Sequence, residues 1–372
     1  MNSPAADAWA ATLALLAEAG EIVTGPLGGK TDRERAEGFR HLTRVLSIAT
    51  EMLLEKGDPA RPEFTRWMNP HRKMLGDNPH TIYDAAVIDP AHSYRISGRR
   101  GTAAYLGICV YGTAGDGARR IIANLDDVDM DIAGDGTFNV EVATTLSGSG
   151  PFLPLEDDAT DLMVRQYFVD HGRETPATYA IEAVADHGPP PPLTEAQVAK
   201  NLQAVGAYVR DIVEVEATLS ALITSVTPTQ LRGGSQFVDA EGNPTEPSVD
   251  PAVIARVMPT PAIQYAGSWF DDLGADEAIV ITGTVPQCRY WSISLLTRWM
   301  ESGDYEHHPV FLSGRDITAN ADGTFRIVIA HSDPGTGNWV DTTGMTSANI
   351  AVRALLAAGP LDIEFTRGPA AP

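Results

Sequence analysis

Apolar residues recur at helical intervals in two parts of the chain. Thr31 and Glu34 have the spacing of a capping box, and apolar positions three or four residues apart follow them. Thr194 and Gln197 repeat this arrangement before a second apolar series. The two series are Phe39, Leu42, Leu46, Ala49 and Leu53, and then Val198, Leu202, Val205, Val209, Ile212 and Leu219. The pattern predicts an N-terminal helical segment and a later linking helix.

The period of the pattern changes to two from about Ile82, which is typical of β-strands. Residues 104–110 and 138–142 alternate in this way, and glycines mark the turns between such segments. Strand patterns resume at about Glu277 and continue to the end of the sequence. A proline-rich spacer, residues 187–193, separates the two β regions, because neither a helix nor a central strand tolerates consecutive prolines. A polar stretch rich in glycine and proline follows the linking helix at residues 227–251.

The two β regions contain an internal repeat. Residues 135–142 (DGTFNVEV) reappear as residues 322–329 (DGTFRIVI), an offset of 187 residues, since 322 minus 135 is 187. A valine-arginine pair closes each copy, at Val164-Arg165 and at Val352-Arg353. Short strands and many glycines, without a strand-helix-strand rhythm, favour sandwiches over a parallel α/β fold.

We therefore predict a mainly β fold with flanking helices, in which two antiparallel β-sandwich or jelly-roll-like domains follow each other. The expected segments are an N-terminal helical segment (1–66), a first β-domain (67–186), the proline spacer with its linking helix (187–226) and a second β-domain (227–372).

Composition and charge exclude several classes of function. The 372 residues include 27 Lys and Arg against 49 Asp and Glu, a formal net charge of −22, which opposes binding to nucleic acid or to anionic membrane surfaces. Cys109 and Cys288 have no metal or redox spacing. No basic residue precedes Lys30 and no apolar run approaches about 20 residues, so we expect a cytoplasmic protein without a signal peptide or membrane span.

Several motifs resemble one bacterial family. They are KMLGDNPHTIY (73–83), IDP with YRISG (88–98), RQYF (165–168), CRYWS (288–292), RWMES (298–302) and DPG with NWVDT (333–342). Together they resemble proteins with the paired domains of unknown function 1254 and 1214, the C-terminal 1214-type domain most clearly. The resemblance implies a double β-sandwich or jelly-roll architecture that is often oligomeric, with no settled activity. The sequence departs from the family after Thr343, where Gly344-Met345-Thr346 replaces a glycine-histidine-arginine run.

Aromatic and ionisable residues concentrate between residues 289 and 341, a combination that lines small-molecule pockets. We predict Glu301, Asp341 and His331 as acid–base residues and Arg298 as the group that stabilises developing charge. The predicted substrate-binding residues are Trp291, Trp299, Trp339, Arg289, Tyr305 and His308, with Asp77, Asn78, His80 and Tyr83 from a loop that could close over this cluster. The alternative is structural: tryptophans as core anchors, an Arg298–Glu301 ion pair, and an ordinary Asp-Asn-Pro turn.

These residues predict a soluble enzyme that applies acid–base catalysis to a small polar or amphipathic metabolite. Hydrolysis of glycoside or ester-like bonds fits best, because tryptophans suit sugar faces and carboxyl groups supply acid and base. A cofactor-independent lyase or isomerase would use the same groups, and a non-catalytic ligand-binding or oligomer-forming module is the competing hypothesis. We expect no cofactor; His331 and Asp333 share a strand face but lack a third ligand for a divalent metal. The expected partners are a small-molecule substrate and further copies of the chain.

Overall fold

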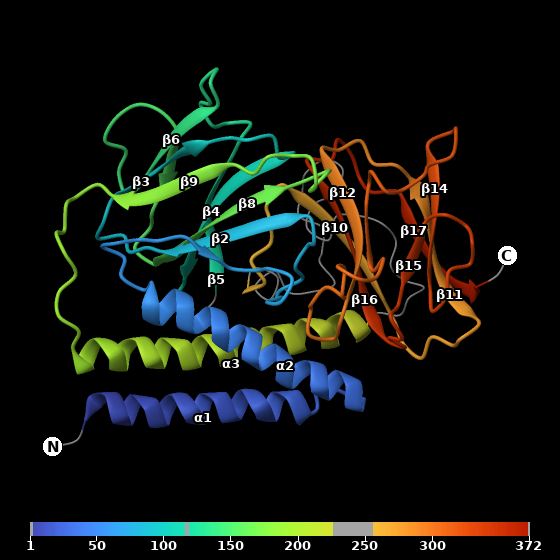
Figure 1. Ribbon diagram of the computed structural model, residues 1–372, viewed down its shortest axis with the longest axis horizontal. Helices are drawn as coiled ribbons and strands as arrows, with labels where there is room; N and C mark the ends of the chain where they lie inside the picture. Colours follow the sequence, from blue (N-terminus) through green and yellow to red (C-terminus); the bar gives the residue numbers. More distant parts are fainter. Residues whose placement is uncertain (1–2, 116–118, 226–255, 371–372) are drawn as a thin grey trace. The chain divides into compact units, whose positions relative to one another are not determined.

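The computed structural model describes residues 3–115, 119–225 and 256–370 (Figure 1). The chain forms two compact units, one of Met1–Arg72 with Thr81–Val215 and the other of Lys73–His80 with Glu216–Pro372. The expected domain boundaries follow the chain order, whereas the two units interleave at residues 73–80. The polar stretch 227–251 lies outside the described residues.

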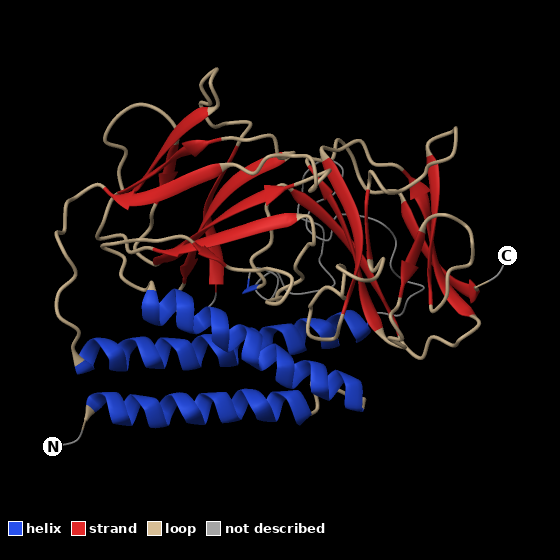
Figure 2. Ribbon diagram, viewed as in Figure 1, coloured by secondary structure: helices blue, strands red, loops and turns tan. Residues whose placement is uncertain are grey.

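The long α-helices of the described residues begin where the capping signals place them or at a proline. They are α1 (Pro4–Thr24), α2 (Asp32–Ala49), which continues into the π-helical turn η1 (Thr50–Glu55), and α3 (Glu195–Ser225) (Figure 2). The capping box of α2 is confirmed, because the Thr31 side chain accepts from the Glu34 amide and the Glu34 side chain accepts from the Thr31 amide. Thr12 of α1 donates to the carbonyl of Leu202 in α3 over 2.8 Å. No helix within the described ranges is long and apolar enough to cross a membrane.

The first unit contains two sheets. Their strands are β1 (Thr65–Arg66), β2 (Thr81–Val87), β3 (Tyr94–Arg99), β4 (Tyr105–Thr113), β5 (Arg119–Asp126), β6 (Thr137–Ala143), β7 (Phe152–Pro154), β8 (Ala159–Tyr167) and β9 (Thr178–Ala183). The sheet orders are β1-β2-β8-β4-β5 and β7-β6-β3-β9, antiparallel except for the parallel pair β6–β7. Alternate residues of both sheets enclose one hydrophobic core, as expected of a sandwich.

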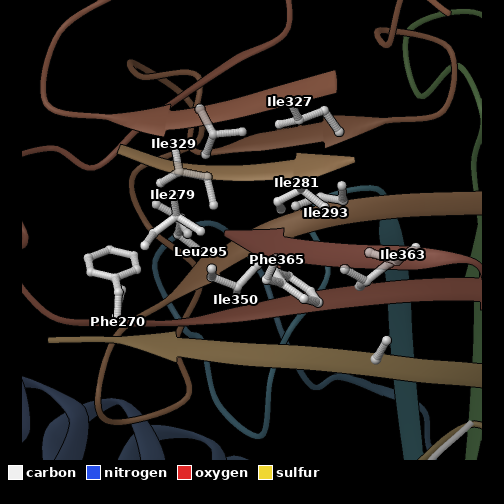
Figure 3. Close-up of a cluster of buried hydrophobic side chains, with 14 of the residues drawn as sticks. Phe270, Ile279, Ile281, Ile293, Leu295, Ile327, Ile329, Ile350, Ile363 and Phe365 are labelled. Atoms are coloured by element: carbon white, nitrogen blue, oxygen red, sulfur yellow. The ribbon is translucent and has the colours of Figure 1, made fainter. Parts of the chain in front are cut away.

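The second unit repeats this arrangement. Its strands are β10 (Ile263–Phe270), β11 (Glu277–Thr284), β12 (Tyr290–Leu296), β13 (Phe311–Ser313), β14 (Thr324–Ala330), β15 (Trp339–Asp341), β16 (Ala348–Leu355) and β17 (Ile363–Pro369). The sheet orders are β10-β16-β12-β13 and β15-β14-β11-β17, and among these described strands β14 and β15 form the parallel pair. Figure 3 shows isoleucines from both sheets meeting in the core of this unit.

The sequence repeat corresponds strand for strand to this topology, so the prediction of two tandem β-domains is confirmed. Strands β2 to β9 occupy the same places in the first unit as β10 to β17 in the second. The repeated Asp-Gly-Thr turns also have the same geometry. Gly136 and Gly323 have φ of 85° and 84°, where a side chain would be strained, and the preceding aspartate caps the following threonine in both copies.

Strand β12 is buried on both of its faces. Ile293 and Leu295 point into the sandwich core, so Ser292 and Ser294 face the opposite side of the sheet. These two serines are fully buried as well. A polar face that is closed to solvent must have a cover with which it can form hydrogen bonds.

Candidate functional site

The segment Lys73–His80 covers the buried polar face of β12, on which Ser292 and Ser294 lie. It has no regular secondary structure, and it belongs to the second unit although the chain on both sides of it belongs to the first. The Asn78 amide donates to Ser292 Oγ over 3.2 Å, and the Tyr290 hydroxyl donates to Asn78 Oδ1 over 3.0 Å. The amide of Gly76 donates to the Met300 carbonyl over 2.7 Å. The segment therefore covers the polar face of β12 through specific hydrogen bonds.

Gly76 allows the segment to approach an arginine of the central strand β16. Its φ is +69°, and a Cβ atom at this position would lie 3.3 Å from Nη2 of Arg353. Arg353 donates to Ser294 Oγ over 2.8 Å and also to the Gly76 carbonyl. The guanidinium is thus held between the strand and the covering segment, with only 4% of the residue exposed.

Asp77 and Lys73 connect the same segment to the turn that follows β12. Asp77 accepts hydrogen bonds from the Ser302 amide (2.7 Å) and from the Ser302 hydroxyl (2.6 Å). The Lys73 ammonium donates to the carbonyls of Ser302 (3.2 Å) and Gly303 (2.6 Å). It also lies over the ring of Tyr305, 4.2 Å from the centroid, in cation–π geometry.

Burial dominates the electrostatics of Asp77. Desolvation raises the pKa of the Asp77 carboxyl above its ordinary value, and the negative charge of Glu301 raises it further. The ammonium of Lys73 and the hydrogen bonds from Ser302 oppose this shift without cancelling it. Asp77 therefore keeps its proton to a higher pH than an exposed aspartate does, which is a property expected of a general acid.

The raised pKa of Asp77 gives a first prediction about stability and pH. The folded chain binds this proton more tightly than the unfolded chain, so the resulting stability is fully present below the ordinary pKa of 3.8 and is lost as pH rises through the folded-state pKa. The free energy of unfolding of the wild type, minus that of Asp77→Asn, is therefore expected to fall as pH rises. Urea unfolding of both proteins at a series of pH values measures this difference.

Asp322 provides a control, because its contribution to stability is expected to change with pH in the opposite direction. Its pKa is lowered, chiefly by hydrogen bonds from Thr324, so the stability that it contributes is present above its ordinary pKa and is lost on acidification. The free energy of unfolding of the wild type, minus that of Asp322→Asn, should therefore rise with pH. A difference for Asp77→Asn that is independent of pH, or that rises with it, would contradict the prediction.

The structure brings several predicted site residues together in the second unit. Arg298, Trp299 and Glu301 lie in the turn after β12, which is closed by a hydrogen bond from the Thr297 amide to the Glu301 carbonyl (2.8 Å), and they are 5%, 0% and 1% exposed. Asp77, Asn78 and His80 come from the covering segment, and Tyr305 lies beside Lys73. The contact between the early loop and the C-terminal cluster, proposed from the sequence, is thus present.

Other predicted substrate-binding residues lie elsewhere. Trp291 points into the sandwich core of the second unit, and Trp339 packs with Val328 on the outer face of the other sheet. Tyr83 belongs to β2 of the first unit, and Arg289 is exposed just before β12. These side chains therefore do not form the single aromatic hollow that the sequence suggested. A cleft of about 450 Å³ in the first unit, between residues 60–63 and 181–188, contains no predicted site residue.

The remaining acid–base candidates have separate partners. Asp341 pairs with His308 over 3.0 Å, and Asp333 accepts from the Gly335 amide. The ring nitrogens of His331 lie 3.0 Å from the Leu273 carbonyl and 2.6 Å from Thr342 Oγ1, so both are engaged. In the part of the chain that the structure describes, no group of three or more His, Cys, Asp or Glu could hold a metal ion.

Three residues of this site were not predicted from the sequence: Lys73, Ser302 and Arg353. The repeat contained a signal for the arginine, because a valine-arginine pair closes both copies. In the first unit Arg165 occupies the equivalent position on β8, is likewise 4% exposed, and donates to the Tyr111 hydroxyl over 2.7 Å. A buried arginine on the central strand is thus common to both repeats.

Residues 268–358 match the family model described as a protein of unknown function, DUF1214. The crystal structure of an uncharacterized protein from Burkholderia cenocepacia has 31% sequence identity, covers 98% of this chain and 97% of its own, and has a TM-score of 0.88. The VPA0106 protein from Vibrio parahaemolyticus has 14% identity over 94% of this chain and 99% of its own, with a TM-score of 0.48. No curated protein matches the chain. The expected 1214-type domain is confirmed, and the 1254-type domain stays a prediction.

Proposed function

The chain belongs to the same family as the Burkholderia cenocepacia protein and contains a DUF1214 domain, and we propose that it is an enzyme that hydrolyses a small polar substrate by acid–base catalysis. The reaction is placed at the cluster formed by the segment Lys73–His80, the turn after β12 and Arg353. This assignment moves the centre of the site away from His331 and Asp341, which lie outside the cluster.

One observation carries the proposal: five charged side chains come from the covering segment, the turn after β12 and strand β16, and none is more than 5% exposed. They are Lys73, Asp77, Arg298, Glu301 and Arg353. Removing a charge from water costs several kcal/mol even after relaxation, and apolar residues of similar size often stabilise a protein as well or better. Buried groups of opposite charge with a shifted pKa are instead frequent at catalytic sites.

The cluster contains the groups that hydrolysis requires. Asp77, with its raised pKa, is the general acid that protonates the leaving group, and Glu301 is the carboxylate that activates water. Arg298 supplies positive charge for the developing negative charge. Lys73 lies at the rim, where the half-buried Tyr305 precedes exposed residues 306–309, and we assign substrate entry to this side.

The proposal is tested by assaying the purified full chain against chromogenic glycosides and esters. We expect turnover of at least one of these substrate classes, and loss of that turnover in Asp77→Asn, which preserves the shape of the side chain. His331→Ala serves as the control, because His331 lies outside the cluster, and it should retain turnover. Failure of the wild type on every substrate, or full activity of Asp77→Asn, would contradict hydrolysis at this site.

A non-catalytic role is the second candidate, and the completeness of the hydrogen bonding favours it. Hydrogen bonds to groups of the same unit are made by Asp77, Lys73 and Arg353. A purely structural role, in which these bonds hold the segment against the sheet, would require the same contacts. If the role is structural, Asp77→Asn is expected to lower the melting temperature, and the wild type is expected to turn over no substrate. The enzymatic proposal predicts turnover by the wild type, so the two candidates give different results in the same pair of experiments.

A further inference from the structure

Helix α1 has exposed apolar residues beside its buried face. The buried face lies within the first unit and includes Ala8, Ala19 and Val23. Trp9 is 55% exposed and Leu13 is 47% exposed. Exposed alanines at positions 6, 10 and 17 lie on the same stripe, because residues three, four and seven apart lie on one side of a helix. The apolar surface of α1 is therefore wider than the part that the first unit buries, and this wider surface indicates a further partner.

The exposed apolar surface continues from α1 onto α2. Phe39 of α2 is 48% exposed, and its ring lies beside α1, where a Cβ atom built on Gly20 would be 3.8 Å from it. Leu27, in the connection between the two helices, is 41% exposed. We call Trp9, Leu13, Leu27 and Phe39 the α1–α2 patch. It holds four of the nine large apolar residues that are exposed among the described residues.

The area of the α1–α2 patch suits a dimer of modest size. A buried aromatic side chain removes about 150–250 Å² from solvent, so half-exposed Trp9 and Phe39, with the two leucines and the alanines, present about 400 Å². Two copies would bury about 800 Å² of apolar surface. Since homodimer interfaces are about 65% apolar, the total approaches about 1,200 Å², at the lower limit of stable interfaces.

The distribution of charge favours a second copy of this chain as the partner that binds the α1–α2 patch. With a net charge of −22, two copies repel each other unless they meet through an uncharged surface, and the exposed stripe of α1 carries no charged residue. The flank of this stripe is acidic, through Asp7 and Glu21, whereas exposed Arg40 lies next to Phe39 on α2. A two-fold axis through the patch would bring the acidic flank of one copy to Arg40 of the other.

We propose that the α1–α2 patch is the self-complementary interface of a homodimer. Sedimentation velocity of the full chain over a range of concentrations is expected to show a monomer–dimer equilibrium. Trp9→Glu and Leu13→Glu are each expected to weaken the dimer by at least about 30-fold, because a charge would replace an apolar group at the centre of the interface. Arg40→Glu should weaken it by about two- to fivefold, since like charges would then face each other.

Val128→Glu is the matched control, because Val128 is 57% exposed but follows β5 and is not part of α1 or α2. The dissociation constant of this variant should equal that of the wild type. Circular dichroism melting of each variant separates loss of association from loss of folding. A wild type that stays monomeric at about 100 μM, or a dimer that tolerates Trp9→Glu and Leu13→Glu, would overturn the proposal. Trp9-dependent co-sedimentation of a monomer with phosphatidylcholine vesicles would also overturn it, by identifying the patch as a lipid-binding surface.

Discussion

Turnover by the Glu301→Gln variant is expected to fall by about 10²–10⁴-fold, the usual contribution of a positioned acid or base. Glutamine keeps the size of the side chain in a site where the wild-type residue is 1% exposed, but it cannot accept the proton of an attacking water. The loss should appear in kcat at saturating substrate, because the variant removes a group that acts in the transition state rather than one that binds the ground state. Steady-state kinetics with the best substrate from the screen measure it.

Glu306→Gln is the control for this experiment. It makes the same chemical change five residues later, where the side chain is exposed, and it is expected to retain wild-type kinetics. The melting temperatures of both variants show whether either change disturbs folding. Full turnover by a folded Glu301→Gln variant would remove Glu301 from the reaction, and the assignment of the base would fail with it.

The fold was largely predictable because its signals are local and repeated. The Asp-Gly-Thr turns and the valine-arginine pairs each report one turn or strand, and their offsets of 187 and 188 residues indicate two copies of one topology. The capping box at Thr31 and the Thr194 side chain, which accepts from the Gln197 amide, mark the starts of α2 and α3 in the same way. Interleaving of the two units at residues 73–80 was not predictable, since it depends on contacts between residues more than 200 positions apart in the sequence.

The site was predictable only in part, and strand alternation explains one of the differences. Trp291, Ile293 and Leu295 share a face of β12, so the tryptophan is buried in the core together with the two aliphatic residues. The same alternation puts Ser292 and Ser294 on the opposite face, which marked that face as polar. What covers this polar face could not be read from the strand itself, and for this reason Lys73 and Arg353 were missed.

Lys73→Met is expected to lower the free energy of unfolding by about 3–5 kcal/mol, the usual cost of removing one member of a buried charged pair. Methionine retains much of the apolar stem but leaves the carbonyls of Ser302 and Gly303 without the ammonium, and it leaves Asp77 without its nearby positive charge. The pKa of Asp77 should then rise further, because the interaction that lowers it is lost. Urea unfolding at neutral pH measures the change.

The double variant Lys73→Met with Asp77→Asn distinguishes an electrostatic cause from a packing cause. If the uncompensated carboxylate causes most of the loss, then removing its charge should restore part of the stability, and the two changes will be less than additive. Lys200→Met, at an exposed position of α3, should leave the free energy of unfolding unchanged. Additive losses in the double variant would show that Lys73 stabilises the segment through its hydrogen bonds to carbonyls and its contact with Tyr305. The positive charge of Lys73 beside Asp77 would then contribute little to holding the segment on the sheet.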